Sequence, residues 1–160
     1  MIELRSRSPE QTRAIAAAMA RLARAGDLIV LSGEMGAGKT AFAQGFARGI
    51  GIDQPVTSPT YTIVHSYDAG PTTLHHADLY RLDHTAEVAD LGLDEFLEDD
   101  AIVLVEWGDV VDLGPHVQVE LRVCDDADED ARDIIITSSD RSWTGRWERL
   151  EAALDEWATA

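Results

Sequence analysis

The chain lacks the features that mark membrane, secreted and disulfide-bonded proteins. Cys124 is the one cysteine among 160 residues, so no disulfide can form within the chain. No run of about 20 apolar residues, the length needed to span a bilayer, occurs in the sequence. No apolar segment follows the charged residues at the start, as it would in a signal peptide. These absences predict a cytoplasmic protein that does not enter a membrane.

Positive charge is also scarce. Thirteen Lys and Arg residues face 30 Asp and Glu, which gives a net charge of −17. Such a surface repels nucleic acid, so any role in an RNA pathway is expected to depend on a partner that holds the RNA. The alternative is that the acidity only keeps the protein in solution. Lys39 is the single lysine beside twelve arginines, and it lies in a glycine-rich loop.

Length and pattern together predict one domain that spans residues 1–160. A chain of this size buries a sizeable core without disulfides. The sequence contains no internal repeat and no linker long enough to divide it.

Strand and helix patterns alternate along the chain, which predicts an α/β fold. Residues 28–31 and 102–105 are continuously apolar, as expected of strands buried on both faces. Ser8, Pro9 and Gln11 predict the start of a helix that continues to Ala25. The remaining predicted helices are 39–48, 85–90 and 94–97, and the remaining predicted strands are 2–6, 61–67, 72–77, 117–123 and 134–137, the last two joined by an acidic hairpin tip.

A stripe of large apolar residues marks the C-terminal segment. Its members recur at intervals of four, three, four and three residues, which indicates one helical face: Trp143, Trp147, Leu150, Leu154 and Trp157. Core packing is the favoured interpretation of this face. A ligand stack, or an exposed partner surface, is the alternative.

Residues 33–40 fit the phosphate-binding pattern G-x-x-x-x-G-K-[ST]. Glycines let successive backbone N–H groups turn inward around an anion, and the helix that follows offers its N-terminal N–H groups. Lys39 is expected to reach the β and γ phosphates, and the Thr40 hydroxyl to bind Mg²⁺. The predicted nucleotide contacts are Gly33, Glu34, Met35, Gly36, Ala37, Gly38, Lys39 and Thr40.

Three further residues are candidates for chemistry beside this loop. Glu106 ends the apolar strand 102–105 and is predicted to complete the Mg²⁺ site, the alternative being a solvent-exposed strand end. Asp78 ends another strand and would orient water, hold a metal-bound water or cap the next turn. Thr60 resembles a threonine that senses the γ phosphate, with a plain turn residue as the alternative.

Five segments, in this order, closely resemble the TsaE family (also called YjeE), small bacterial ATPases of tRNA threonylcarbamoyladenosine synthesis. They are residues 33–40, 57–62, 76–82, 91–95 and 105–107. The S-P-T-aromatic-T and H-x-D-x-Y-R-L segments are far more specific than the glycine-rich loop. The resemblance covers roughly residues 8–107.

This resemblance implies a P-loop α/β sandwich with a mixed, mostly parallel sheet, flanking helices and an added antiparallel hairpin. It implies ATP and Mg²⁺ as cofactors, with hydrolysis that is slow alone and faster with partners. Those partners would be TsaD and TsaB, which attach the threonylcarbamoyl group to tRNA beside the anticodon. The ATP cycle would reset their complex, and tRNA would be met only through them.

The resemblance also implies roles for single residues. Thr40 and Glu106 would hold Mg²⁺, and Asp78 and Thr60 would serve hydrolysis. Trp107 would lie near the nucleotide.

The resemblance leaves three positions without a definite role, and near Thr12 the alignment to the family is loose. An adenine contact would fall near Thr12, and Arg81 would meet either phosphate or a partner. Residues 108–111 depart from the family pattern, in which many members carry a further Glu or Arg, so any role just past Trp107 is left open.

Two rival functions remain open at this point. A small-molecule kinase needs a mobile lid with clustered arginines, whereas the arginines here are scattered and residues 107–115 are too few for a lid. A nucleotide-dependent binding switch with negligible hydrolysis would make Asp78 and Thr60 structural.

Overall fold

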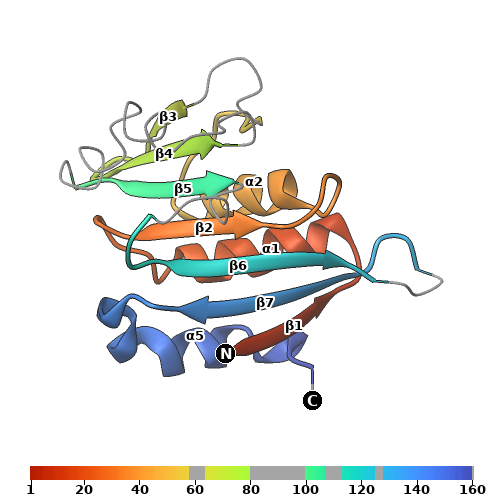
Figure 1. The fold of residues 1–160 in the computed structure, drawn as a ribbon. Coiled ribbons are helices and arrows are strands. Elements are labelled where there is room, and N and C mark those ends of the chain that lie inside the picture. The colour runs from red at the N-terminus through yellow and green to blue at the C-terminus, as the bar shows by residue number, and fades with distance from the viewer. Residues whose placement is uncertain (58–63, 80–99, 107–112, 125–127, 160) are drawn as a thin grey trace.

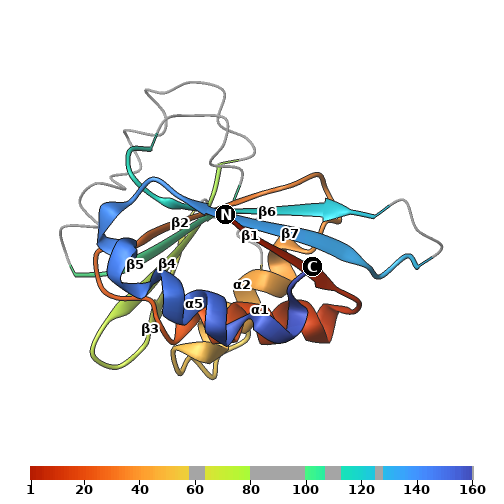
Figure 2. The same cartoon turned by 90° about the horizontal axis from the view of Figure 1, so that it is seen from below.

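A seven-stranded sheet forms the frame of the protein, with the strand order β1-β7-β6-β2-β5-β4-β3. The computed structural model describes residues 1–57, 64–79, 100–106, 113–124 and 128–159. Helices α1, α2 and α5 all lie on one face of the sheet (Figures 1 and 2). In chain order the elements are β1 (Ile2–Ser6), α1 (Pro9–Ala20), β2 (Leu28–Ser32), α2 (Lys39–Gly49), β3 (Val64–Asp68), β4 (Thr73–Asp78), β5 (Ile102–Glu106), β6 (Val117–Val123), β7 (Arg132–Ser138), η2 (Arg141–Arg146), α5 (Trp147–Ala153) and η3 (Asp155–Trp157).

The sheet is parallel in its centre and antiparallel toward both edges. β2 pairs in parallel with both β5 and β6, and β4 pairs in parallel with β5. β3 lies antiparallel on one edge, and β7 and β1 follow antiparallel on the other. Every residue of β2 and β5 is buried, as their apolar sequences predict. The predicted α/β class, with its mixed sheet and antiparallel hairpin, is confirmed.

The two faces of the central strands belong to two separate apolar clusters. On the helix side, Ile29 and Leu104 pack in one cluster with Phe42 and Phe46 of α2. On the opposite face, Val30 packs with its neighbours from β4 and β5 in a smaller cluster. Residues that are paired across parallel strands point to the same face, so this division fixes which side chains at the strand ends face α2.

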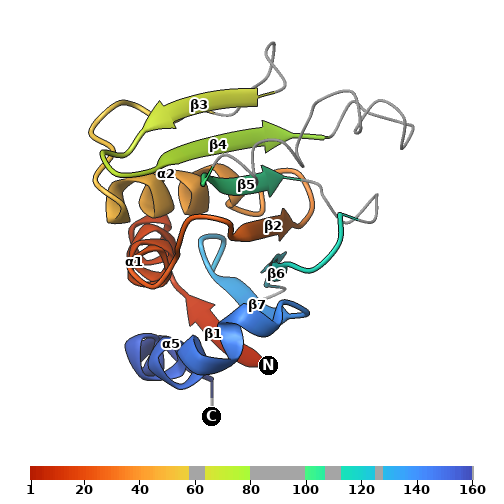
Figure 3. The same cartoon turned by 90° about the vertical axis from the view of Figure 1, so that its left-hand side faces the viewer.

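Small residues let α1 and α2 pack closely (Figure 3). A Cβ at Gly45 would collide with the backbone of Arg13 in α1. A Cβ at Gly49 would stand only 2.7 Å from the carbonyl oxygen of Ala17. The four-residue spacing of both pairs places these contacts on one face of each helix.

The start of α1 agrees with the prediction. The Ser8 side chain caps the helix by accepting the N–H of Gln11 at 3.1 Å. Gln11 Oε1 in turn accepts the N–H of Arg7 at 2.9 Å. The first bond satisfies one of the N–H groups that a helix start leaves without partners. The second holds Arg7, the residue before the cap, instead of the N–H of Ser8 itself.

The predicted end of α1 at Ala25 is wrong, because the helix ends at Ala20. Asp27 Oδ2 accepts the N–H of Arg24 at 2.7 Å, which takes that donor away from a helical ladder. The N–H of Ala23 turns back to the Ala20 carbonyl in a tighter turn. A side-chain acceptor seven residues beyond the helix therefore sets its end.

The C-terminal apolar face is part of the core, although its backbone is not one continuous helix. Two 3₁₀ turns, η2 and η3, flank α5. Trp143, Leu150 and Leu154 are fully buried, and Trp147 and Trp157 are partly buried against the same cluster. The core-packing interpretation of the stripe is confirmed.

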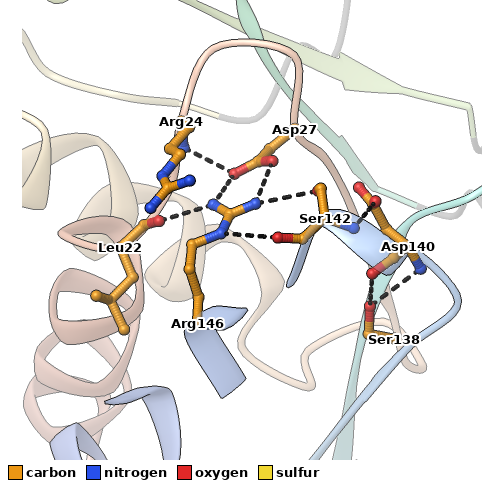
Figure 4. Close-up of polar contacts among 7 residues, drawn as sticks. All are labelled: Leu22, Arg24, Asp27, Ser138, Asp140, Ser142 and Arg146. Atoms are coloured by element: carbon orange, nitrogen blue, oxygen red, sulfur yellow. Dashed lines mark hydrogen bonds and ion pairs between the residues drawn. The ribbon is translucent and has the colours of Figure 1, made fainter. Parts of the chain in front are cut away.

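A buried ion pair joins this segment to the turn before β2 (Figure 4). Arg146 donates to both carboxylate oxygens of Asp27, at 2.8 and 3.0 Å. It also donates to the Leu22 carbonyl at 2.8 Å and to Ser142 Oγ at 3.2 Å. Its guanidinium carbon lies 3.9 Å from the centre of the Trp143 ring. These contacts give hydrogen-bond partners to most of the N–H groups of the Arg146 guanidinium, so its positive charge is well compensated despite its burial.

Several predicted elements lie outside the described residues. These are the helices 85–90 and 94–97 and the first three residues of the strand predicted at 61–67, of which the described part begins at Val64. Within the described ranges, no helix is both long and apolar enough to cross a membrane.

Candidate functional site

The glycine-rich loop lies at the edge where the parallel strands end. It connects Ser32, the last residue of β2, to Lys39, the first residue of α2. The carboxyl ends of β2, β4, β5 and β6 all point to this edge, and the first turn of α1 lies there too (Figure 1). In open α/β sheets, ligands bind outside the carboxyl ends of the strands.

The loop has the backbone shape of an anion cradle. Gly33, Gly36 and Gly38 have φ angles of +148°, +83° and +103°, a region that side chains disfavour. Gly33 also has no room for a Cβ, which would stand 2.5 Å from the carbonyl oxygen of Leu121 in β6. The glycines of the motif are therefore required by geometry and by close packing.

The N-terminus of α2 differs from that of α1 in its cap. Ser8 provides a side-chain hydrogen bond at the start of α1, whereas Gly38 at the start of α2 provides none. The first N–H groups of a helix have no partners within the helix and carry its positive dipole end. At α2 no side-chain cap occupies this end, which makes it a candidate anion site.

Lys39 lies over the loop that it follows. Its Nζ donates to the carbonyl of Gly33 at 2.6 Å and to the carbonyl of Glu34 at 2.9 Å. The side chain is buried, while the next residue, Thr40, is half-buried in the first turn of α2. The ammonium group and the Thr40 hydroxyl thus come from consecutive positions beside the loop.

Glu106 lies next to the loop, at the end of the adjacent strand. It is paired in register with Leu31 of β2 and with Asp78 of β4, so its side chain faces α2. Its exposed fraction is 3%, and the alternative of a solvent-exposed strand end is therefore wrong. Asp78 is half-buried beside it. The structure brings the two predicted carboxylates together at the edge that carries the loop.

His76 is a site residue to which the sequence analysis gave no role. Its Nε2 lies 2.9 Å from Glu106 Oε2, and both side chains are buried. A carboxylate accepts, so the histidine Nε2–H is the donor. Nδ1 has no hydrogen-bond partner among the described residues. The signal was available, because His76 stands two residues before Asp78 and thus on the same face of β4.

The donor set fits Mg²⁺ held jointly with phosphate. No group of three or more His, Cys, Asp or Glu side chains that could hold a metal occurs among the described residues. Magnesium in phosphate sites uses one or two protein ligands and takes the rest from phosphate and water. Thr40 and Glu106, an oxygen donor on each of two adjacent elements, match that requirement.

Other predicted contacts are not tested by this geometry. The Thr12 hydroxyl is buried and shares a hydrogen bond of 2.7 Å with Ser6 Oγ, so an adenine contact near Thr12 stays a prediction. Thr60, Arg81 and Trp107 lie outside the described residues.

Residues 6–134 match a family model described as "Threonylcarbamoyl adenosine biosynthesis protein TsaE". The chain belongs to the TsaE family. That match includes the loop, both carboxylates, His76, all of β6 and the first residues of β7.

Individual members of the TsaE family are similar over most of their length. The tRNA threonylcarbamoyladenosine biosynthesis protein TsaE of Bacillus subtilis is 41% identical over 86% of this chain and 85% of its own. Its counterpart in Streptomyces coelicolor is 43% identical over 78% of this chain and 88% of its own. The crystal structure of Bacillus subtilis YdiB superposes with a TM-score of 0.76, at 34% identity, and covers 98% of this chain and 97% of that one.

Proposed function

We propose that this protein is a Mg²⁺-dependent ATPase that supports threonylcarbamoyladenosine modification of tRNA by driving turnover of a TsaD–TsaB complex. The relatives carry the name of that biosynthesis. The observation that supports ATP chemistry most strongly is the buried Glu106 beside a glycine-rich loop and an uncapped helix start. A buried carboxylate at the edge where ligands bind is a candidate functional group.

The loop and α2 would bind the phosphates. The three glycines at positive φ turn backbone N–H groups toward an anion, and α2 adds its N-terminal dipole. Lys39 would exchange its two loop carbonyls for phosphate oxygens, a stronger charge-assisted contact. The lysine is thus already placed beside the cradle.

Thr40 and Glu106 would hold the Mg²⁺ ion. When bound, the ion neutralises charge on the β and γ phosphate oxygens. The Thr40 hydroxyl offers a neutral oxygen and Glu106 a carboxylate, while His76 holds that carboxylate in one orientation by its hydrogen bond at 2.9 Å. Partners of this kind fix the direction of a metal ligand.

Asp78 would orient the water that attacks the γ phosphate. It is paired with Glu106 across two parallel strands and is half-buried, so water can reach it. The role of Thr60 in sensing the γ phosphate rests on its motif alone. Both assignments require hydrolysis as the outcome, in contrast to phosphate transfer to an alcohol.

The charge of the chain supports an indirect role toward tRNA. A net charge of −17 disfavours direct contact with nucleic acid. TsaD and TsaB would therefore hold the tRNA, and this protein would act on them in the cytoplasm.

The test is ATP hydrolysis by the purified protein, alone and with an added TsaD–TsaB pair. We expect slow hydrolysis that rises severalfold with the pair and is lost in a Lys39→Ala variant, since the ammonium contact to phosphate disappears. Arg48→Ala, a change of an exposed cation at the far end of α2, is the matched control and should leave hydrolysis unchanged.

Other outcomes separate the rival functions. Phosphate transfer to a small alcohol would favour a kinase. Nucleotide-dependent binding to the pair without turnover would favour a switch. Hydrolysis that does not respond to the pair would contradict the proposed role in tRNA modification.

A further inference from the structure

The β6–β7 hairpin forms one wall of the glycine-rich loop. β6 pairs with β2 as far as Ser32, which lies opposite Glu120. The next residue of β6, Leu121, meets the loop itself. A Cβ added to Gly33 would lie 2.5 Å from the carbonyl oxygen of Leu121. A Cβ added to Gly38 would lie 3.7 Å from Leu121 Cδ2. The hairpin therefore touches both ends of the loop.

Arg132 reaches the middle of the same loop. It is the first residue of β7 and pairs with Val123. One of its terminal nitrogens, Nη2, donates to the Gly36 carbonyl at 3.2 Å. The other, Nη1, donates to the carbonyls of Glu129 at 2.6 Å and Ala131 at 2.8 Å. The planar fork is thus fixed to the hairpin turn on one side and to the loop on the other.

Lys39 Nζ and the N–H of Ala37 hold the Glu34 carbonyl, and Arg132 adds a hydrogen bond two residues further on, at Gly36. Glu34, Met35 and Gly36 are exposed, and open space surrounds the Cβ position of Gly36. Buried Nε of Arg132 has no hydrogen-bond partner among the described residues. An unpaired buried N–H is costly, so the contacts within the described part of the hairpin do not by themselves explain why the guanidinium lies there.

We propose that Arg132 is a positioning residue of the nucleotide site. By holding the Gly36 carbonyl it keeps the loop in one conformation, which fixes the direction of the N–H groups that meet phosphate. It also adds positive charge near a site in a strongly acidic chain. This inference rests on the proposed binding of nucleotide at the loop. Because the loop would bind phosphates that ATP and ADP share, the contact should raise the affinity for both nucleotides equally.

The experiment measures dissociation constants of fluorescent ATP and ADP analogues, with unfolding temperatures alongside. Arg132→Gln should weaken both nucleotides about tenfold, because a hydrogen bond from a charged donor is lost. Arg132→Lys should recover part of the affinity, since it keeps the charge but cannot bridge the turn and the loop. Arg122→Gln removes an arginine that binds Glu120 on the same hairpin and should match the wild type.

Each result either supports or overturns the role of Arg132. Arg132→Gln with wild-type affinity for both nucleotides overturns the inference and leaves nucleotide binding intact. A wild-type protein that binds neither nucleotide overturns both the inference and the proposed function. Should Arg132→Gln fail to fold, Arg132→Lys decides: a severalfold loss for both nucleotides at an unchanged unfolding temperature supports the role, and wild-type affinity contradicts it.

Discussion

Two buried carboxylates with basic partners lie at opposite ends of the central strands. Asp27 precedes β2, where its two oxygens receive Arg146 and the N–H of Arg24. Glu106 ends β5, where one of its oxygens receives His76. Both carboxylates are about equally buried, with exposed fractions of 3%. Among the described residues, they differ in how many hydrogen bonds the protein donates to each.

This difference supports the proposal that Asp27 has a structural role and Glu106 a functional one. A carboxylate that is met by a bidentate arginine and a backbone N–H has little capacity left for a ligand. A carboxylate with one histidine partner keeps acceptor capacity for a cation. In α/β sheets ligands bind at the carboxyl ends of the strands, which is where Glu106 lies. Burial alone therefore does not distinguish the two carboxylates, whereas their hydrogen bonds and their positions in the sheet support different proposed roles.

Removing Asp27 should give the largest loss of stability. Asp27→Ala leaves Arg146 buried without its counter-charge, which costs about 3–5 kcal/mol in free energy of unfolding. Urea unfolding measures this loss. Asp133→Ala is the matched control, because Asp133 pairs with Arg5 at 2.9 Å with both side chains 38% exposed, and it should cost less than about 1 kcal/mol. Equal losses of unfolding free energy in the two variants would show that the buried Asp27–Arg146 pair contributes no more than an exposed one.

Removing the hydrogen-bond donor of His76 should lower the rate of ATP hydrolysis more than it lowers the stability of the protein. His76→Phe keeps a ring but leaves Glu106 without its donor, and we expect ATP hydrolysis to fall about 10- to 100-fold. His76→Gln can still donate and should recover part of the rate. The measurement is hydrolysis as a function of Mg²⁺ concentration.

His75→Phe is the control for this prediction. His75 stands next in the chain but bonds Ser66 at 2.7 Å, away from Glu106. It should leave hydrolysis unchanged. A rate for His76→Phe equal to that of His75→Phe would show that the histidine does not orient the carboxylate.

The strands and the loop were predictable because their signals are local. Continuous apolar runs mark β2 and β5, and the loop motif carries its glycines in sequence order. The assignment of Glu106 followed from its place at the end of an apolar strand. The burial and register of that residue agree with this reasoning.

The remaining features depend on contacts between distant segments. The end of α1 is set by Asp27, and the pairing of Asp27 with Arg146 joins positions 119 residues apart. His76 and Glu106 are 30 residues apart, and Arg132 meets Gly36 from 96 residues away. Spacing along β4 places His76 on the same face as Asp78, but it does not identify the partner that each of these residues meets. Such pairs appear only once the sheet register is known.

The most direct test of the account is Mg²⁺-dependent ATP hydrolysis by Glu106→Gln at saturating nucleotide, with Asp27→Asn beside it. We expect Glu106→Gln to lose hydrolysis by about 100-fold or more, the scale expected when one group that stabilises developing charge is removed. Asp27→Asn should lose stability but hydrolyse ATP at the wild-type rate per folded molecule. Wild-type hydrolysis by Glu106→Gln would contradict the account.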